Sequence, residues 1–184
     1  MSIADAPDGR PVSCQQPEEF AEVYRTHFPR IFGFVVSRLR DHELSQELTA
    51  DVFASAYERW GQLRDQSAVT WWLFAIARNN IAGYFRSRER ELRARVRLES
   101  LAGDGFADDC PAEEVERSYD VERLKTFICR LSEADQELLS LRFDAALTSV
   151  EIGNVLGISQ QNVRVRVFRA LQRLRELMTS QAAT

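Results

Sequence analysis

Glutamine and arginine, whose side chains form paired hydrogen bonds with the edges of DNA bases, are concentrated between residues 160 and 169. Apolar residues recur through this segment at helical spacing and are expected to form an inward stripe: Val163, Val167, Ala170, Leu171 and Leu174. The outward candidates for base recognition are then Gln160, Gln161, Arg164, Val165, Phe168 and Arg169. A solvated basic face is the alternative, but an outward Phe168 favours a surface that contacts DNA.

A short predicted helix and a glycine turn come immediately before this surface. Thr148 and Glu151 have the spacing of a capping box, which predicts that a helix starts at Thr148. Gly157 is expected to end that helix, because glycine adopts the left-handed conformation without a Cβ clash. Ser159 is placed to cap the following helix. We interpret the segment as a helix-turn-helix that presents its second helix to the DNA major groove.

A second basic segment, from Trp71 to Arg97, mixes aromatic side chains with arginine. Between Arg78 and Arg97 the chain has seven arginines and only two acids. Aromatic rings stack on unpaired bases and arginines follow the phosphate backbone, so this composition is typical of a surface that binds single-stranded nucleic acid. The same aromatic residues must also build a hydrophobic core. For any one of them, such as Trp72, both roles remain open.

Charge is distributed unevenly over the 184 residues, although the formal net charge is only −4. The basic segment is followed by an acidic one, with nine acids and a single arginine between residues 99 and 122. Such a segment is predicted to be a linker that is extended by its own charge repulsion. Another acidic row lies on one side of the helix predicted over 43–60 and consists of Glu47, Asp51 and Glu58. Helix statistics alone favour a solvated face for this row.

The sequence carries no pattern typical of an enzyme or a metal site. Its three cysteines lack CxxC spacing, His27 and His42 lie far apart, and no glycine-rich phosphate loop is present. We therefore expect no catalytic residues, metal, cofactor or small-molecule substrate. No apolar run approaches the length of a membrane span, and the opening residues lack the apolar core of a signal peptide. A cytoplasmic protein without membrane insertion is expected.

Helical periodicity and scarce glycine and proline predict an all-α fold of two small helical domains. The expected order is a flexible tail over 1–16, a helical domain over 17–97, an acidic flexible linker over 98–118 and the helix-turn-helix domain over 119–184. The first domain is expected to contain helices over 18–40 and 43–60, a polar loop over 61–67 and a third helix. Ser67 is predicted to cap this third helix, and Ser132 to cap a helix of the second domain.

Two motifs give the chain a family resemblance. The segment Trp72-Leu73-Phe74-Ala75-Ile76-Ala77-Arg78-Asn79 is similar to the W-L-x-x-I-A-R-N motif in the second conserved region of sigma-70 family RNA polymerase sigma factors. The segment from Glu151 to Arg166 is similar to the fourth region of that family. Both motifs occur in the family order, with a linker between them too short for a third-region domain. Over roughly residues 18–178 the chain resembles the extracytoplasmic-function (ECF) group.

The resemblance implies a factor that binds core RNA polymerase and promoter DNA. Core polymerase would bind the acidic row of Glu47, Asp51 and Glu58. The −35 element, as duplex, would be read by the outward face of residues 160–169. The −10 element, as a melted single strand, would be held by Trp71, Trp72, Arg78, Asn79, Asn80 and Arg86. The chain departs from the family pattern at Gly153, where alanine is usual, and at Gly83, where aspartate is frequent.

Free in solution, the chain is expected to bind promoters weakly, and we hypothesise that the acidic linker covers its basic surfaces. An anti-sigma factor is a further partner that the resemblance allows. The alternative function is a helix-turn-helix transcriptional regulator without a polymerase role. A helical scaffold that binds only proteins is a third reading, and it would show no dependence on DNA.

Overall fold

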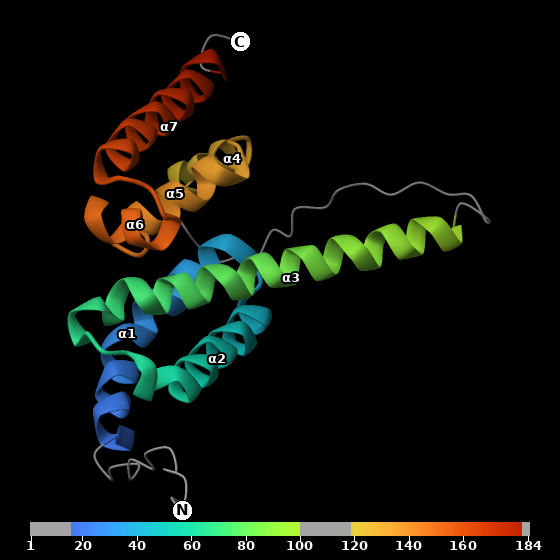
Figure 1. The fold of residues 1–184 in the computed structure, drawn as a ribbon. Coiled ribbons are helices and arrows are strands. Elements are labelled where there is room, and N and C mark those ends of the chain that lie inside the picture. Colours follow the sequence, from blue (N-terminus) through green and yellow to red (C-terminus); the bar gives the residue numbers. More distant parts are fainter. Residues whose placement is uncertain (1–15, 100–118, 182–184) are drawn as a thin grey trace, which may run out of the picture.

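The computed structural model describes residues 16–99 and 119–181, and all regular structure within these ranges is helical. The predicted all-α class is therefore confirmed. The seven α-helices of these ranges are α1 (Gln16–Leu39), α2 (His42–Arg59), α3 (Val69–Glu99), α4 (Tyr119–Cys129), α5 (Glu133–Phe143), α6 (Ser149–Leu156) and α7 (Gln160–Gln181). Figure 1 shows α1, α2 and α3 together as a first half (16–99), with α4 to α7 as a second half (119–181) beside it.

The predicted tail over 1–16 and the predicted linker over 98–118 lie almost wholly outside the described residues. Only Gln16, at the start of α1, and residues 98–99, at the end of α3, are described from these segments. The hypothesis that the linker covers basic surfaces falls on the same residues.

The connection between α2 and α3 differs from the predicted loop over 61–67. It contains two short 3-10 turns, η1 (Trp60–Gln62) and η2 (Gln66–Ala68). Ser67 does not cap α3, so that prediction was wrong. Asp65 accepts hydrogen bonds from the Ser67 backbone N–H (2.9 Å) and hydroxyl (2.7 Å) instead, because a carboxylate ahead of the turn is the stronger acceptor.

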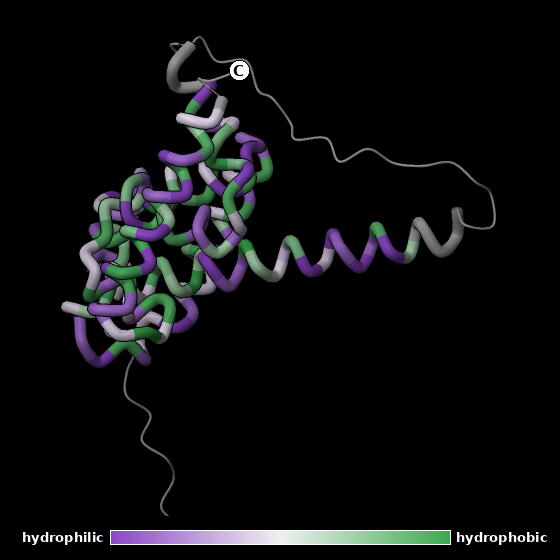
Figure 2. The backbone as a smooth tube through the Cα atoms, turned by 90° about the horizontal axis from the view of Figure 1, so that it is seen from above, coloured by the Kyte–Doolittle hydropathy of each residue, from purple (hydrophilic) through white to green (hydrophobic). Residues whose placement is uncertain are grey.

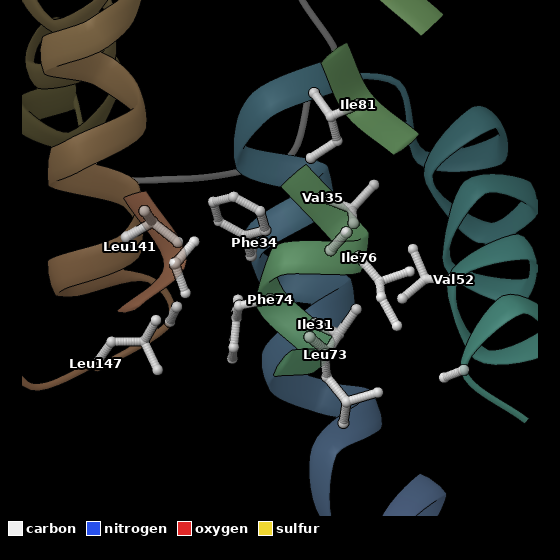
Figure 3. Close-up of a cluster of buried hydrophobic side chains, with 14 of the residues drawn as sticks. Ile31, Phe34, Val35, Val52, Leu73, Phe74, Ile76, Ile81, Leu141 and Leu147 are labelled. Atoms are coloured by element: carbon white, nitrogen blue, oxygen red, sulfur yellow. The ribbon is translucent and has the colours of Figure 1, made fainter. Parts of the chain in front are cut away.

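One hydrophobic core crosses the boundary between the two halves. In the first half, Phe34 of α1 and Phe74 of α3 are fully buried, with ring centroids 5.5 Å apart and nearly perpendicular ring planes. Figure 3 shows these rings between the first-half helices and Leu141 and Leu147 of the second half. α1 contacts α5, and α3 contacts α6. The two halves thus pack against each other, which explains why α1 is apolar on more than one face.

The C-terminal part of α3 has few such contacts. Figure 2 shows this part as a largely hydrophilic helix that extends away from the packed body. Residues 85–94 are all exposed. Within the described ranges, none of the helices combines the length and apolar character needed to cross a membrane.

Candidate nucleic-acid interface

The helix-turn-helix predicted from the sequence is formed by α6 and α7. The Glu151 N–H donates to Thr148 Oγ1 (3.3 Å) and the Thr148 N–H donates to the Glu151 carboxylate (2.7 Å), which completes the capping box. Gly157 has a φ of 68° in the left-handed region and ends α6. The Asn162 N–H donates to Ser159 Oγ (3.3 Å), so the cap of α7 is also confirmed.

Gly153 in α6 allows the turn to approach this helix closely. A Cβ atom at this position would lie 2.7 Å from the backbone carbonyl oxygen of Ile158, a distance that real Cβ atoms do not tolerate. The Ile158 N–H also donates to the Gly153 carbonyl oxygen (3.0 Å). The glycine costs helix propensity, but it lets the turn pack against α6 and so sets the path by which α7 begins.

The two sides of α7 are separated as the periodicity predicts, with one exception. Val163, Ala170 and Leu174 are buried, whereas Leu171 is 39% exposed and was wrongly assigned to the inward stripe. Positions 163, 167, 170 and 174 follow the alternating three- and four-residue spacing of one helix face, and position 171 lies beyond its edge. The candidates for base recognition are all exposed: Gln160, Gln161, Arg164, Val165, Phe168 and Arg169.

Two further arginines of α7 have roles that the periodicity did not indicate. Arg166 donates from Nε to the Asn162 side-chain oxygen (3.1 Å), which orients an exposed guanidinium group along the helix. Arg173 forms two hydrogen bonds with the Asp135 carboxylate of α5, at 2.9 and 2.7 Å. Asp135 is buried, so this paired contact joins α7 to α5 and is structural.

The candidates on α3 do not form a single surface. Trp72, Asn79 and Arg86 are seven residues apart, and this spacing places them on one side of the helix. Arg78 follows Trp71 by seven residues and lies on a neighbouring side, whereas Asn80 falls on a third side. Both tryptophans are half-buried against the core, and the Trp72 ring lies 6.4 Å from that of Trp60. The structure therefore gives both tryptophans core contacts and leaves part of each accessible.

Arg78 faces the second half of the molecule. Its Nε atom lies 3.0 Å from the Glu137 carboxylate of α5. Nearby, the Arg30 guanidinium donates twice to the backbone carbonyl oxygen of Ala145, at 3.1 and 2.8 Å. These contacts join residues that are widely separated in the chain, and no local pattern in the sequence indicated them.

Acidic groups of α5 surround a second arginine at this boundary. Burial lowers the pKa of the Arg38 guanidinium, while the carboxylates of Glu137 and Glu133 act in the opposite direction. The face of α5 that carries these acids is thus turned toward arginines of the first half. Ser37 and Ser140 hydroxyls, 2.5 Å apart, add a neutral hydrogen bond to the same boundary.

The acidic row on α2 is exposed. Glu47, Asp51 and Glu58 are all accessible, and the buried residues of α2 lie on its other side. Their exposure agrees with either a solvated face or a protein-binding face, and their role stays a prediction. Within the described ranges, no group of three or more His, Cys, Asp or Glu side chains is placed to hold a metal ion.

Comparison with known proteins identifies both halves. Residues 23–91 match the family model of sigma-70 region 2, and residues 128–176 match that of sigma-70 region 4. The ECF RNA polymerase sigma factor SigM of Bacillus subtilis is 30% identical over 158 residues, which span 85% of this chain and 93% of SigM. The ECF RNA polymerase sigma factor RpoE of Cereibacter sphaeroides is 29% identical, over 87% of this chain and 86% of that protein.

Solved structures share the fold. The sigma factor RpoE of Bartonella quintana, in complex with the anti-sigma factor NepR, matches with a TM-score of 0.68 at 23% identity, over 88% of this chain and 98% of that chain. CnrH in complex with the cytosolic domain of CnrY matches with a TM-score of 0.63 at 19% identity, over 89% of this chain and 90% of that chain. Both regions are present in the family order, and the second contains a helix-turn-helix with both helices capped. The protein belongs to the ECF group of RNA polymerase sigma factors.

Proposed function

We propose that this chain binds core RNA polymerase, recognises the −35 and −10 promoter elements and promotes promoter melting. The observation that carries the proposal is the capped α6–α7 unit, which exposes glutamine and arginine on one face of α7. This face fits the DNA major groove in a chain that also matches region 2 of the family.

The −35 element is read by α7 in this proposal. Arg164 and Gln161 lie near the start of the helix, where a recognition helix contacts base edges. Phe168 is 62% exposed and presents an apolar surface to thymine methyl groups or sugar atoms. Arg169 is close enough to the base-reading face to contact a neighbouring phosphate, which positions the helix without reading sequence.

The −10 element is bound by α3 as a single strand. Trp72, Asn79 and Arg86 share one side of the helix, so they offer a ring, an amide and a guanidinium group along one line. Unstacking a base costs a few kcal/mol, and contacts of this kind offset that cost. Arg78 joins this surface only when its contact with Glu137 is released.

Core polymerase binds the acidic row of α2 in this proposal. Glu47, Asp51 and Glu58 are exposed along one side of a helix whose other side is fixed in the core. A polymerase that holds the two halves apart at a set distance lets two weak DNA contacts act jointly through effective concentration. Separation of the halves also frees Arg78 of α3, which Glu137 of α5 contacts in the packed arrangement.

We further propose a cytoplasmic location and an anti-sigma factor as partner. Both solved relatives described above are complexes, one with an anti-sigma factor and one with the cytosolic domain of another protein. Glu137 of the second half contacts Arg78 of α3, and any protein that stabilises this packing of the two halves would regulate the chain. A helix-turn-helix regulator without a sigma role remains the competing function, and transcription with purified components distinguishes the two.

The test is transcription in vitro with core RNA polymerase, genomic DNA fragments and the full chain as the only added factor. Promoter-specific transcripts are expected, because a sigma factor supplies both recognition and melting. A regulator would give such transcripts only when another sigma factor is added, and that result would overturn the proposal.

Charge-neutral variants of the acidic row sharpen the same assay. Replacing Glu47, Asp51 and Glu58 with the corresponding amides is expected to abolish association with core polymerase while duplex binding by α7 persists. The matched control replaces three other exposed acids, Glu18, Glu19 and Glu176, with glutamine. If both triple variants lose polymerase association equally, the acidic row has no specific role.

A further inference from the structure

Four arginines from both halves of the molecule line one cleft. Arg78 enters it from α3, and Arg166, Arg169 and Arg173 enter it from α7. The cleft has a volume of about 360 Å³, and Leu138 and Leu156 contribute apolar side chains to its wall. Guanidinium groups repel one another, so four of them around one small cleft favour an anion between them.

The described residues supply only part of that negative charge. Two carboxylates line the cleft, and each is engaged: Glu137 with Arg78 at 3.0 Å, and buried Asp135 with Arg173 at 2.7 and 2.9 Å. These pairs hold two guanidinium groups in fixed positions. Arg166 bonds to the neutral Asn162 side chain, and among the described residues neither it nor Arg169 has a carboxylate within ion-pair distance. Among the described residues, the lining of the cleft therefore keeps a surplus of positive charge.

The shape and charge of the cleft favour one ligand chemistry. A guanidinium group matches two oxygens of a phosphate with two parallel hydrogen bonds, and Arg is preferred over Lys where such recognition is needed. The volume is at the lower end of the range for small-molecule sites and is too small for a DNA duplex. We propose that this cleft binds a small ligand with adjacent phosphate groups, such as inorganic pyrophosphate or a nucleoside triphosphate.

Such a ligand would act on the arrangement of the two halves. Because the site contains guanidinium groups from α3 and from α7, it is complete only while the halves are packed together. A ligand that binds only this arrangement stabilises it by mass action. The ligand also competes with the −10 strand for Arg78. Reciprocally, the bound strand lowers the affinity of the cleft for the ligand. Binding itself does not depend on the proposed sigma function, whereas this competition rests on it.

The experiment is calorimetric titration of the full chain with inorganic pyrophosphate, and separately with a nucleoside triphosphate, at constant ionic strength. Saturable binding of one ligand per chain is expected for at least one of the two compounds. Their Kd values then show whether free pyrophosphate or a nucleoside triphosphate is the better ligand. Arg169→Gln and Arg78→Gln are each expected to raise the Kd about tenfold, the loss typical of one charge-assisted hydrogen bond. Arg169→Gln leaves both internal ion pairs in place, so its effect does not report on folding.

Matched controls are available on the same two helices. Arg175 of α7 and Arg90 of α3 are exposed and do not line the cleft. Arg175→Gln and Arg90→Gln are expected to change the Kd by less than about twofold, because long-range charge is screened by salt. Equal losses in the controls would overturn the proposal in favour of diffuse charge attraction. The proposal is also overturned if neither compound shows saturable binding. The same holds if Arg78→Gln binds the ligand as tightly as the unaltered chain does, since the first half would then contribute nothing to the site.

A second readout separates this site from the proposed function. Saturating ligand is expected to raise the Tm of the unaltered chain more than that of Arg169→Gln, whose Kd is about tenfold higher. Failure of transcription with core polymerase leaves this result untouched, because no polymerase or promoter enters the measurement. An equal rise in Tm in both proteins would assign the stabilisation to general ion effects and overturn the site.

Discussion

The candidate DNA-binding surfaces on α3 and α7 differ in how the rest of the molecule uses them. On α7, the inward stripe and Arg173 contact the rest of the protein, and the base-recognition face is exposed. On α3, the side that carries Arg78 meets the acidic face of α5. The duplex-reading surface is thus available in the packed arrangement, while part of the strand-binding surface is occupied. A helix that uses one face for packing keeps the other free, and a helix between two neighbours does not.

The largest expected effect is on stability, and it comes from a comparison of two phenylalanines, one on α3 and one on α7. Phe74 is fully buried between the halves, whereas Phe168 is 62% exposed on α7. Phe74→Ala is expected to lower the free energy of unfolding by about 3–5 kcal/mol, because it leaves a cavity in the shared core. Phe168→Ala is expected to change it by less than about 0.5 kcal/mol. Urea unfolding followed by circular dichroism measures both, and similar losses would mean that Phe168 is packed in solution.

The recognition face of α7 gives the next largest effect. Arg164 is exposed near the start of this helix. Arg164→Ala is expected to weaken binding to a −35 duplex by about 1–3 kcal/mol, and mainly for one base pair, if the guanidinium reads a base edge. Fluorescence anisotropy with a set of single-base duplex variants provides the measurement. An equal loss on every duplex would reassign Arg164 to a phosphate contact.

The occupied side of α3 gives a smaller effect of opposite sign. Glu137→Gln removes the charge that engages Arg78 and is expected to strengthen binding of the free chain to a −10 single strand by about 1 kcal/mol. The magnitude is limited because the Arg78 side chain is 38% exposed, so solvent screens the pair. Glu89→Gln is the matched control, since Glu89 pairs with Arg93 on the exposed part of α3.

Strand affinity, measured at constant salt, discriminates between two explanations of that result. A gain confined to Glu137→Gln supports competition between α5 and the DNA strand. The same gain in Glu89→Gln would trace the change to the overall charge of the chain and would remove the contrast between α3 and α7.

The smallest effect is a pH dependence of stability that involves His27. Burial, followed by the positive charge of Arg30, lowers the pKa of His27 below its ordinary value of 6.5. Below that pH the unfolded chain binds a proton at this position that the folded chain does not. The contribution of His27 to stability is therefore fully present above pH 6.5 and declines as the pH falls. Arg30 also donates to the Ala145 carbonyl oxygen, so the second cause of this shift lies where the halves meet.

Thermal unfolding at about pH 7.5 and about pH 5.5 measures this decline. His27→Gln is expected to lose less Tm on acidification than the unaltered chain. The only other histidine, His42, is exposed, and His42→Gln is expected to keep the full decline. If the two variants respond alike, other titrating groups cause the acid sensitivity.

Much of the helix-turn-helix was predictable because its signals are local. The capping box at Thr148, the left-handed Gly157 and the Ser159 cap each act within a few positions, and all three are confirmed. Two local predictions were wrong for equally local reasons. Asp65 is a stronger acceptor than Ser67, and Leu171 lies just beyond the edge of the inward stripe.

The candidate strand-binding surface was less predictable. Composition alone indicated that the segment from Trp71 to Arg97 is aromatic and basic, but not which side of α3 each residue would occupy. The helix separates Trp72 from Arg78, and the second half contacts Arg78 through Glu137. Neither the split nor the contact follows from composition, since both depend on which neighbours pack against α3.

Helix limits, caps and the exposed face of α7 follow from the chain's own local chemistry, because hydrogen bonds and side-chain periodicity act over one or two turns. The packing of the halves, the engagement of Arg78 by Glu137 and the arginine-lined cleft appear only in the folded molecule. The Arg30 contact with Ala145 joins positions 115 residues apart. Contacts at such separations depend on how whole helix surfaces fit together, and no short stretch of residues encodes that fit.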